Sequence, residues 1–83
     1  MKARLNGVRR IKISGDYIKL DALLKYACIA SSGGEAKILI NSGDIIVGGV
    51  PCYVRGRKIR PGDIVRYYDD TLFVSKKVQS SKQ

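Results

Sequence analysis

Two amphipathic helices joined by a very short link limit most strongly what this chain can fold into. The first helix, expected within residues 20–30, is indicated by apolar residues at positions i, i+3, i+4 and i+7, namely Leu20, Leu23, Leu24 and Ala27. The second lies in SSGGEAKILINSG, where Ser32 and Glu35 have capping-box spacing and Gly43 has the position of a C-terminal cap. We expect Ser32 to be the N-cap and Glu35 to reach back to it. About four residues join the helices, so the helices must pack as a close pair.

Strand patterns flank the helix pair on both sides. The segment RRIKI alternates apolar and basic residues before the helices. After them, DIIV and VPCYV flank Gly48-Gly49, which is typical of a two-residue hairpin turn. RPGD at 60–63 predicts a type II turn, and IVRYY and LFVS predict a last hairpin that turns at Asp69-Asp70. These elements predict an α+β fold, with a two-helix pair packed on a small, mostly antiparallel sheet.

A chain of 83 residues has room for one core. We expect residues 1–10 to form a basic N-terminal segment, either mobile or at a sheet edge. We expect residues 11–75 to form the folded domain and residues 76–83 to form a polar, disordered tail. No apolar run approaches the roughly 20 residues that a membrane span needs, so we expect no membrane association.

The charge of the chain is strongly positive, because sixteen Lys and Arg residues stand against seven Asp and Glu. A formal net charge of +9 favours nucleic acid, an anionic membrane or an acidic protein as partner. The N-terminus has no apolar signal segment, which predicts a cytoplasmic protein with reduced cysteines. We expect Cys28 and Cys52 both to be buried structural thiols.

The residues that most enzymes need are missing from this sequence. The chain has no His, and its carboxylates are scattered singly except at Asp69-Asp70, which turn chemistry explains. No Ser or Cys has a base nearby, so there is no candidate catalytic constellation. Two cysteines without His cannot form an ordinary four-ligand zinc site. We therefore expect a protein that is not an enzyme and uses no cofactor or metal.

Two groups of cations stand out against this background. The helix pair carries Lys19, Lys25 and Lys37 away from its apolar stripe, and the segment VRGRKIRPGD carries Arg55, Arg57, Lys58 and Arg60. Four cations within six residues repel one another unless an anion compensates them. Arginine suits phosphate because its planar fork can bind two oxygens at once. The alternative is that these residues form only a solvated polar face and a charged loop.

The order of these motifs resembles the ribosomal-protein S-four type of RNA-binding domain, and most of all its small stand-alone bacterial members, the YbcJ-like proteins. The resemblance covers Lys19 to Val65 and rests on an ordered set of short motifs. These are Lys19-Leu20-Asp21, Leu23-Leu24, Ser31-Ser32, Glu35-Ala36-Lys37, Leu39-Ile40, Gly43, Val47-Gly48-Gly49 and Pro61-Gly62-Asp63. The resemblance implies that the helix pair and the adjacent loop form an RNA-binding face.

This sequence departs from the family pattern at the start of the second helix, because many members have two arginines where it has Gly33-Gly34. The cations from Arg55 to Arg60 are therefore expected to carry more of the binding. We hypothesise that the two glycines replace side-chain contacts to phosphate with main-chain N–H contacts at the positive end of the helix dipole. The alternative is that one glycine is needed for a positive φ in the turn between the helices.

The resulting expectation is a monomeric, non-catalytic module that recognises structured RNA by shape and phosphate contacts. Side chains cannot read the deep major groove of A-form RNA, so recognition is expected to depend on shape and phosphate contacts. Ribosomal RNA or tRNA is therefore the expected target. Of the five tyrosines, Tyr26 is expected in the core, and one of Tyr67 and Tyr68 outside. Exposed tyrosines could stack on bases, although packing is the alternative for each. A basic adaptor that docks on an acidic protein, or a protein that binds DNA non-specifically, remains an alternative function.

Overall fold

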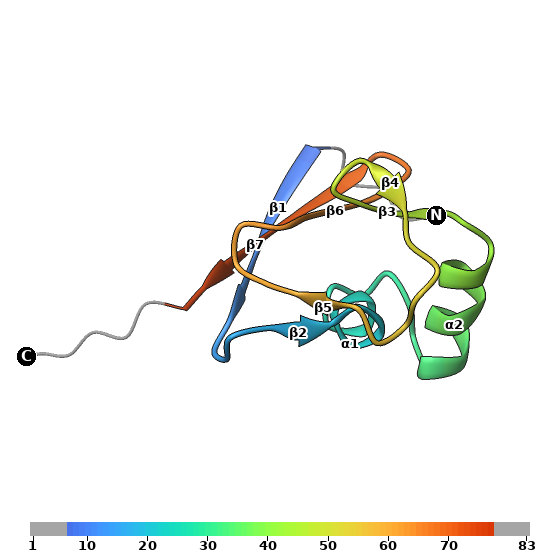
Figure 1. Cartoon of the computed structure of the whole chain (residues 1–83), viewed down its shortest axis with the longest axis horizontal. Helices are drawn as coiled ribbons and strands as arrows, with labels where there is room; N and C mark the ends of the chain where they lie inside the picture. The colour runs from blue at the N-terminus through green and yellow to red at the C-terminus, as the bar shows by residue number, and fades with distance from the viewer. Residues whose placement is uncertain (1–6, 78–83) are drawn as a thin grey trace, which may run out of the picture.

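The computed structural model describes residues 7–77, in which two strands, two helices and five further strands follow one another along the chain (Figure 1). In chain order these are β1 Gly7–Ile13, β2 Ile18–Lys19, α1 Leu20–Tyr26, α2 Gly33–Asn41, β3 Ile45–Val47, β4 Val50–Pro51, β5 Lys58–Ile59, β6 Ile64–Tyr67 and β7 Asp70–Lys76. The first strand begins at Gly7, so part of the expected N-terminal segment lies at the edge of the sheet. The rest of that segment and most of the expected polar tail lie outside the described residues.

Five strands form one sheet in the order β1-β7-β6-β3-β4. The edge strand β1 runs parallel to β7, and every other neighbouring pair in this sheet is antiparallel. The short strands β2 and β5 form a separate antiparallel ribbon. Figure 1 shows this ribbon and α1 beneath the five-stranded sheet, with α2 at one end. The predicted fold class is confirmed, with the addition of one parallel strand pair.

The core lies between the sheet and the helices. Strand alternation directs Ile11, Leu72 and Val65 from three adjacent strands to the same side of the sheet, where all three are buried. From the other layer, α1 contributes Leu20, Leu23 and Leu24, which are completely buried. Burial of a Leu side chain stabilises a fold by about 1.5–3 kcal/mol. The three leucines of α1 are therefore a major source of stability for so small a domain.

The helix α2 is capped at both ends, as its sequence predicts, with one difference. Ser32 is the N-cap, and its hydroxyl accepts a hydrogen bond from the backbone N–H of Glu35 at 3.1 Å. The Glu35 carboxylate does not reach back to Ser32. Its Oε1 instead accepts from the backbone N–H of Ser31 at 2.6 Å and from the Ser31 hydroxyl at 2.7 Å. Two donors on one residue hold the carboxylate more strongly than the single N–H of Ser32 could. Beyond the helix, Gly43 has a φ of 84° and ends it as predicted.

The helix α1 is shorter than the apolar pattern predicts, and this corrects two expectations. It ends at Tyr26, and Cys28 follows with a φ of 62°, so six residues rather than about four separate the helices. Cys28 is exposed because it lies in this left-handed turn, whereas Cys52 is buried as expected. Tyr26 is also exposed rather than in the core, with 62% of its surface accessible. It lies beside the buried stripe of leucines and not within it.

The hairpin turns follow their sequence signals in two cases out of three. Gly48 and Gly49 both have positive φ in the β3–β4 turn, and Gly62 has a φ of 99° in the turn before β6. The last hairpin turns one residue earlier than predicted, because Tyr67 pairs with Asp70 across it. Asp70 is therefore the buried first residue of β7, and its carboxylate lies 3.8 Å from the Arg9 guanidinium. An ion pair thus replaces the turn role expected for this carboxylate.

The Glu35 cap generates a pH-dependent prediction. The pKa of the Glu35 carboxyl lies below its usual value of 4.5 because the Ser31 N–H, and then the Ser31 hydroxyl, donate hydrogen bonds to the anion. The ionised cap therefore stabilises the folded state above pH 4.5, and this contribution is lost as the pH falls through the lowered pKa. We expect wild type to be more stable than Glu35→Gln at neutral pH and this difference to shrink on acidification. Urea unfolding of both proteins across the acidic range measures the difference, and a constant difference would contradict the prediction.

Candidate nucleic-acid interface

The loop between β4 and β5 closes the N-terminal end of α1. The N-cap residue Lys19 provides no side-chain hydrogen bond to the helix. The backbone N–H groups of Leu20 and Asp21 instead donate to the carbonyl oxygens of Arg57 and Arg55, at 2.9 and 3.2 Å. N–H groups in the first turn of a helix have no partner inside the helix, so these carbonyls satisfy them. The contacts fix two predicted RNA-binding residues, Arg55 and Arg57, beside the start of α1.

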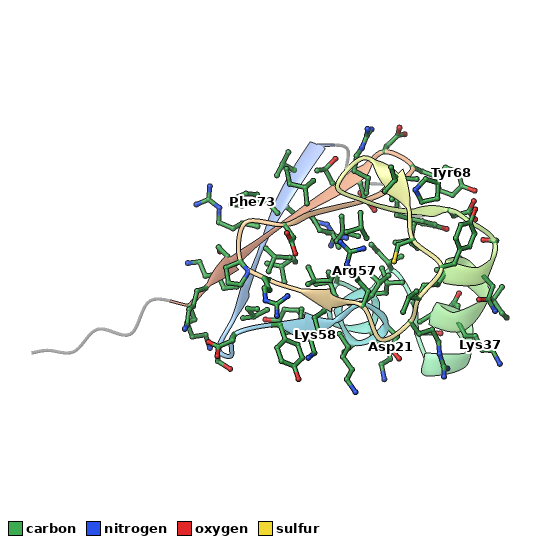
Figure 2. The ribbon with its side chains drawn as sticks, viewed as in Figure 1. Asp21, Lys37, Arg57, Lys58, Tyr68 and Phe73 are labelled. Atoms are coloured by element: carbon green, nitrogen blue, oxygen red, sulfur yellow. The ribbon has the colours of Figure 1, made fainter. Side chains whose placement is uncertain are left out.

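The ribbon of β2 and β5 adds two more cations at the same place. Lys19 and Lys58 occupy directly opposite positions on the two strands. Like charges at opposite positions of a strand pair are destabilising unless something compensates them. The fold thus gathers four of the seven predicted residues around the start of α1, and we define Lys19, Arg55, Arg57 and Lys58 as the basic cluster. Figure 2 shows Arg57 in the middle of the view and Lys58 toward the lower edge, so the side chains of these two neighbours do not point the same way. All four are exposed.

No carboxylate of the described chain forms an ion pair with the basic cluster. The ion pairs within residues 7–77 are Arg9–Asp70 and Lys76–Asp16, and neither includes a cluster residue. The Lys58 ammonium lies 5.0 Å from the centre of the Tyr17 ring, in a cation–π contact. The Arg57 guanidinium makes a weak, 4.0 Å contact to the Cys52 sulfur. The cluster charges are therefore available to an external anion.

The other three predicted cations lie on three different elements of the fold. Lys37 is exposed on α2, and Figure 2 shows it on the same lower edge of the molecule as Lys58 and Asp21. Lys25 is exposed in the last turn of α1, where a positive charge favours the helix dipole. Arg60 directly follows β5 and opens the turn in which the Gly62 N–H donates to the Val74 carbonyl oxygen of β7. The fold thus places Lys37 on the same edge of the molecule as Lys58, and it places Arg60 two residues beyond Lys58 along the chain.

The two glycines lie in the first turn of α2, as predicted, but neither has a positive φ. The alternative that a left-handed turn requires one of them is therefore wrong. A Cβ atom added at Gly33 would meet nothing within 4 Å, and one at Gly34 would lie 3.8 Å from the Ser32 hydroxyl. The start of α2 is open, but the Glu35 carboxylate already occupies a position near it. A phosphate that approaches the glycine N–H groups would have to tolerate this negative charge.

The pairing of Lys58 with Tyr17 and with Lys19 is the feature of this site that the sequence did not reveal. The partner strands are only two residues long, so neither carries a periodic pattern that could identify the other. Tyr17 was expected to stack on bases or to pack inside the fold. It is 42% exposed, with the Lys58 ammonium over its ring. An exposed ring beside cations is the arrangement used to hold unpaired bases.

The described residues contain no group of three or more His, Cys, Asp or Glu side chains arranged to hold a metal ion. Neither helix within residues 7–77 is long and apolar enough to cross a bilayer.

Comparison with known proteins agrees with the order of the sequence motifs. The sequence profile of the S4 domain matches residues 11–75. The probable ribosome maturation protein RlbA of Bacillus subtilis (strain 168) is 38% identical over 55 residues. The aligned region covers 66% of this chain and 78% of that relative. Because the profile spans both helices and nearly the whole sheet, the chain belongs to the S4 domain family.

Proposed function

We propose that this protein is a monomeric, non-catalytic module that binds structured RNA in the cytoplasm, with a role in ribosome maturation. The observation that carries the proposal is the basic cluster of Lys19, Arg55, Arg57 and Lys58, whose charges have no carboxylate partner in the described chain. Membership of the S4 domain family supports RNA as the ligand. The name of the relative RlbA supports ribosomal RNA over tRNA as the target.

The geometry favours contacts to the phosphate backbone over contacts to base edges. The cluster lies at the junction of a ribbon, a loop and a helix start, and side chains cannot read the deep, narrow major groove of an RNA helix. It can lie along the backbone, with the arginines forming paired hydrogen bonds to phosphate oxygens. Such contacts position a protein without reading sequence. Recognition therefore depends on the shape of the RNA.

The salt dependence of binding tests the phosphate contribution. If the four cluster cations each engage a phosphate, log K should fall with log salt concentration at a slope of roughly −3 to −4. Fluorescence anisotropy with a labelled RNA stem-loop over a series of KCl concentrations measures this slope. A flat response would contradict electrostatic binding. An acidic protein or duplex DNA that competes as well as the RNA would favour the adaptor or the non-specific DNA alternative.

Charge reversal in the cluster tests the location of the site. We expect Arg57→Glu/Lys58→Glu to abolish most binding to the stem-loop, because two attractive contacts become repulsive. The free energy of unfolding should change by less than about 1 kcal/mol, since these side chains make only weak contacts within the fold. The matched control is Lys76→Glu/Lys77→Glu, which changes the net charge equally at the end of β7. It also removes the Lys76–Asp16 ion pair, which is exposed and therefore contributes little to stability. Equal losses in both variants would show that net charge, and not the cluster, determines binding.

Gly34→Ala tests the main-chain phosphate contact. A Cβ atom fits at this position without strain, so we expect the free energy of unfolding to stay unchanged or to rise by up to about 1 kcal/mol. If the N–H groups at the start of α2 bind phosphate, affinity for the stem-loop should nevertheless fall by about 1 to 3 kcal/mol, the value of a charge-assisted hydrogen bond. Wild-type affinity would remove the two glycines from the RNA site.

A further inference from the structure

The outer face of the five-stranded sheet is not covered by any described element. Both helices and the β2–β5 ribbon lie on the other side of the sheet (Figure 1). Residues that alternate with the core residues therefore face outward, and several are large and apolar. Val8 on β1 is 70% exposed and Ile64 on β6 is 43% exposed. An uncovered sheet face with apolar side chains is more often an interaction surface than a random feature.

The outward side chains form rows across the strands. One row contains Arg10, Phe73 and Ile64, which occupy matching positions on β1, β7 and β6. A second contains Val8, Thr71, Arg66, Ile46 and Pro51, and a third contains Lys12 and Ser75. These rows hold three cations and no acidic residue. The nearest strand carboxylate, Asp70, faces the core, where it is buried beside Arg9.

Phe73 is the central residue of β7, one strand in from the edge of this outer sheet face. Its ring lies 5.9 Å from the Arg10 guanidinium, on the neighbouring strand. Lys12 and Arg66 lie at diagonal positions on either side, a spacing of about 7–8 Å in a sheet. Figure 2 shows Phe73 in the upper part of the view and Lys58 toward the lower edge, with Arg57 between them. A half-buried aromatic ring thus lies beside one guanidinium, and two further cations occupy diagonal positions on the same face.

We propose that the outer sheet face is a second RNA-binding surface, which takes an unpaired RNA segment by stacking a base on Phe73 and holding its phosphates with Arg10, Lys12 and Arg66. The combination of a ring and flanking cations, without a carboxylate, complements a nucleotide in both its apolar face and its charge. Unpaired RNA fits better than a duplex, because base faces are accessible to a ring only outside a double helix. The surface goes beyond the proposed function, since it needs no contact with the basic cluster.

A single tryptophan provides a direct test. The chain contains no Trp, so Phe73→Trp creates one fluorophore on the outer sheet face. We expect a short oligouridine to quench its fluorescence on binding. Phe73→Leu, which keeps an apolar side chain but removes the ring, should weaken oligouridine binding at least about fivefold, equivalent to roughly 1 kcal/mol. Arg10→Gln should also weaken binding, and the matched single-charge control Lys25→Gln should not.

Two further measurements separate this proposal from the proposed function. The Arg57→Glu/Lys58→Glu variant should keep its affinity for oligouridine while losing the stem-loop. Phe73→Leu should keep its affinity for a stem-loop with the shortest possible loop, which offers few unpaired bases. Thermal unfolding of each variant establishes that it is folded. If Phe73→Leu is unfolded, Arg10→Gln replaces it as the test variant.

Three results would contradict the proposal of a second RNA-binding surface. The first is oligouridine binding that is unchanged in Phe73→Leu and Arg10→Gln. The second is oligouridine binding that is lost together with the basic cluster, which would place both RNAs at one site. The third is displacement of labelled oligouridine by another polyanion as readily as by unlabelled oligouridine. If a blunt RNA duplex competes this well, the surface binds charge without base stacking. If polyglutamate competes this well, an acidic protein is the favoured partner.

Discussion

The hydrogen bonds from the start of α1 to the carbonyls of Arg55 and Arg57 are the contacts on which both the fold and the basic cluster depend. A helix of seven residues is unstable alone, because the cost of nucleation exceeds what so few hydrogen bonds return. Burial of three leucines and closure of the first turn by the loop compensate this cost. The same closure brings a loop more than thirty residues away in sequence against the helix. The charges of that loop reach the helix surface because its carbonyls cap the helix.

Local signals predicted the parts of the fold that local geometry determines. The N-cap Ser32, the C-terminal Gly43 and the Gly48-Gly49 turn each require a particular residue at a particular backbone conformation, and each was predicted correctly. The end of α1 was not predicted, because the apolar period continues through Ala27 and Ala30, which remain buried after the helix has stopped. Periodicity reports which residues face the core and does not distinguish a helix from a compact turn that packs against the same core.

The candidate site likewise has features that the sequence predicted and features that depend on tertiary contacts. The sequence identified the seven cations, and each of them is exposed as expected. It did not reveal which of them meet, because Lys19 and Lys58 are brought together by a two-residue ribbon with no pattern of its own. The open sheet face was also missed. Arg10 and Lys12 were recognised as the polar side of a strand, but Phe73 joins them only through the parallel pairing of β1 with β7, strands at opposite ends of the chain.

Two basic faces on one small domain raise the question of whether they act as one. At physiological ionic strength, charges in water are screened over about 8 Å, whereas a sheet and the layer packed on it are about 10 Å apart between their centres. Side chains that point outward from the two layers are farther apart still. The basic cluster and the outer sheet face therefore share the long-range attraction of the net charge of +9, whereas the local fields at the two surfaces are separate. A rigid RNA helix cannot contact both faces at once. If both proposed surfaces bind RNA, this arrangement predicts a protein that joins a paired and an unpaired RNA segment, rather than one that binds a single segment more tightly.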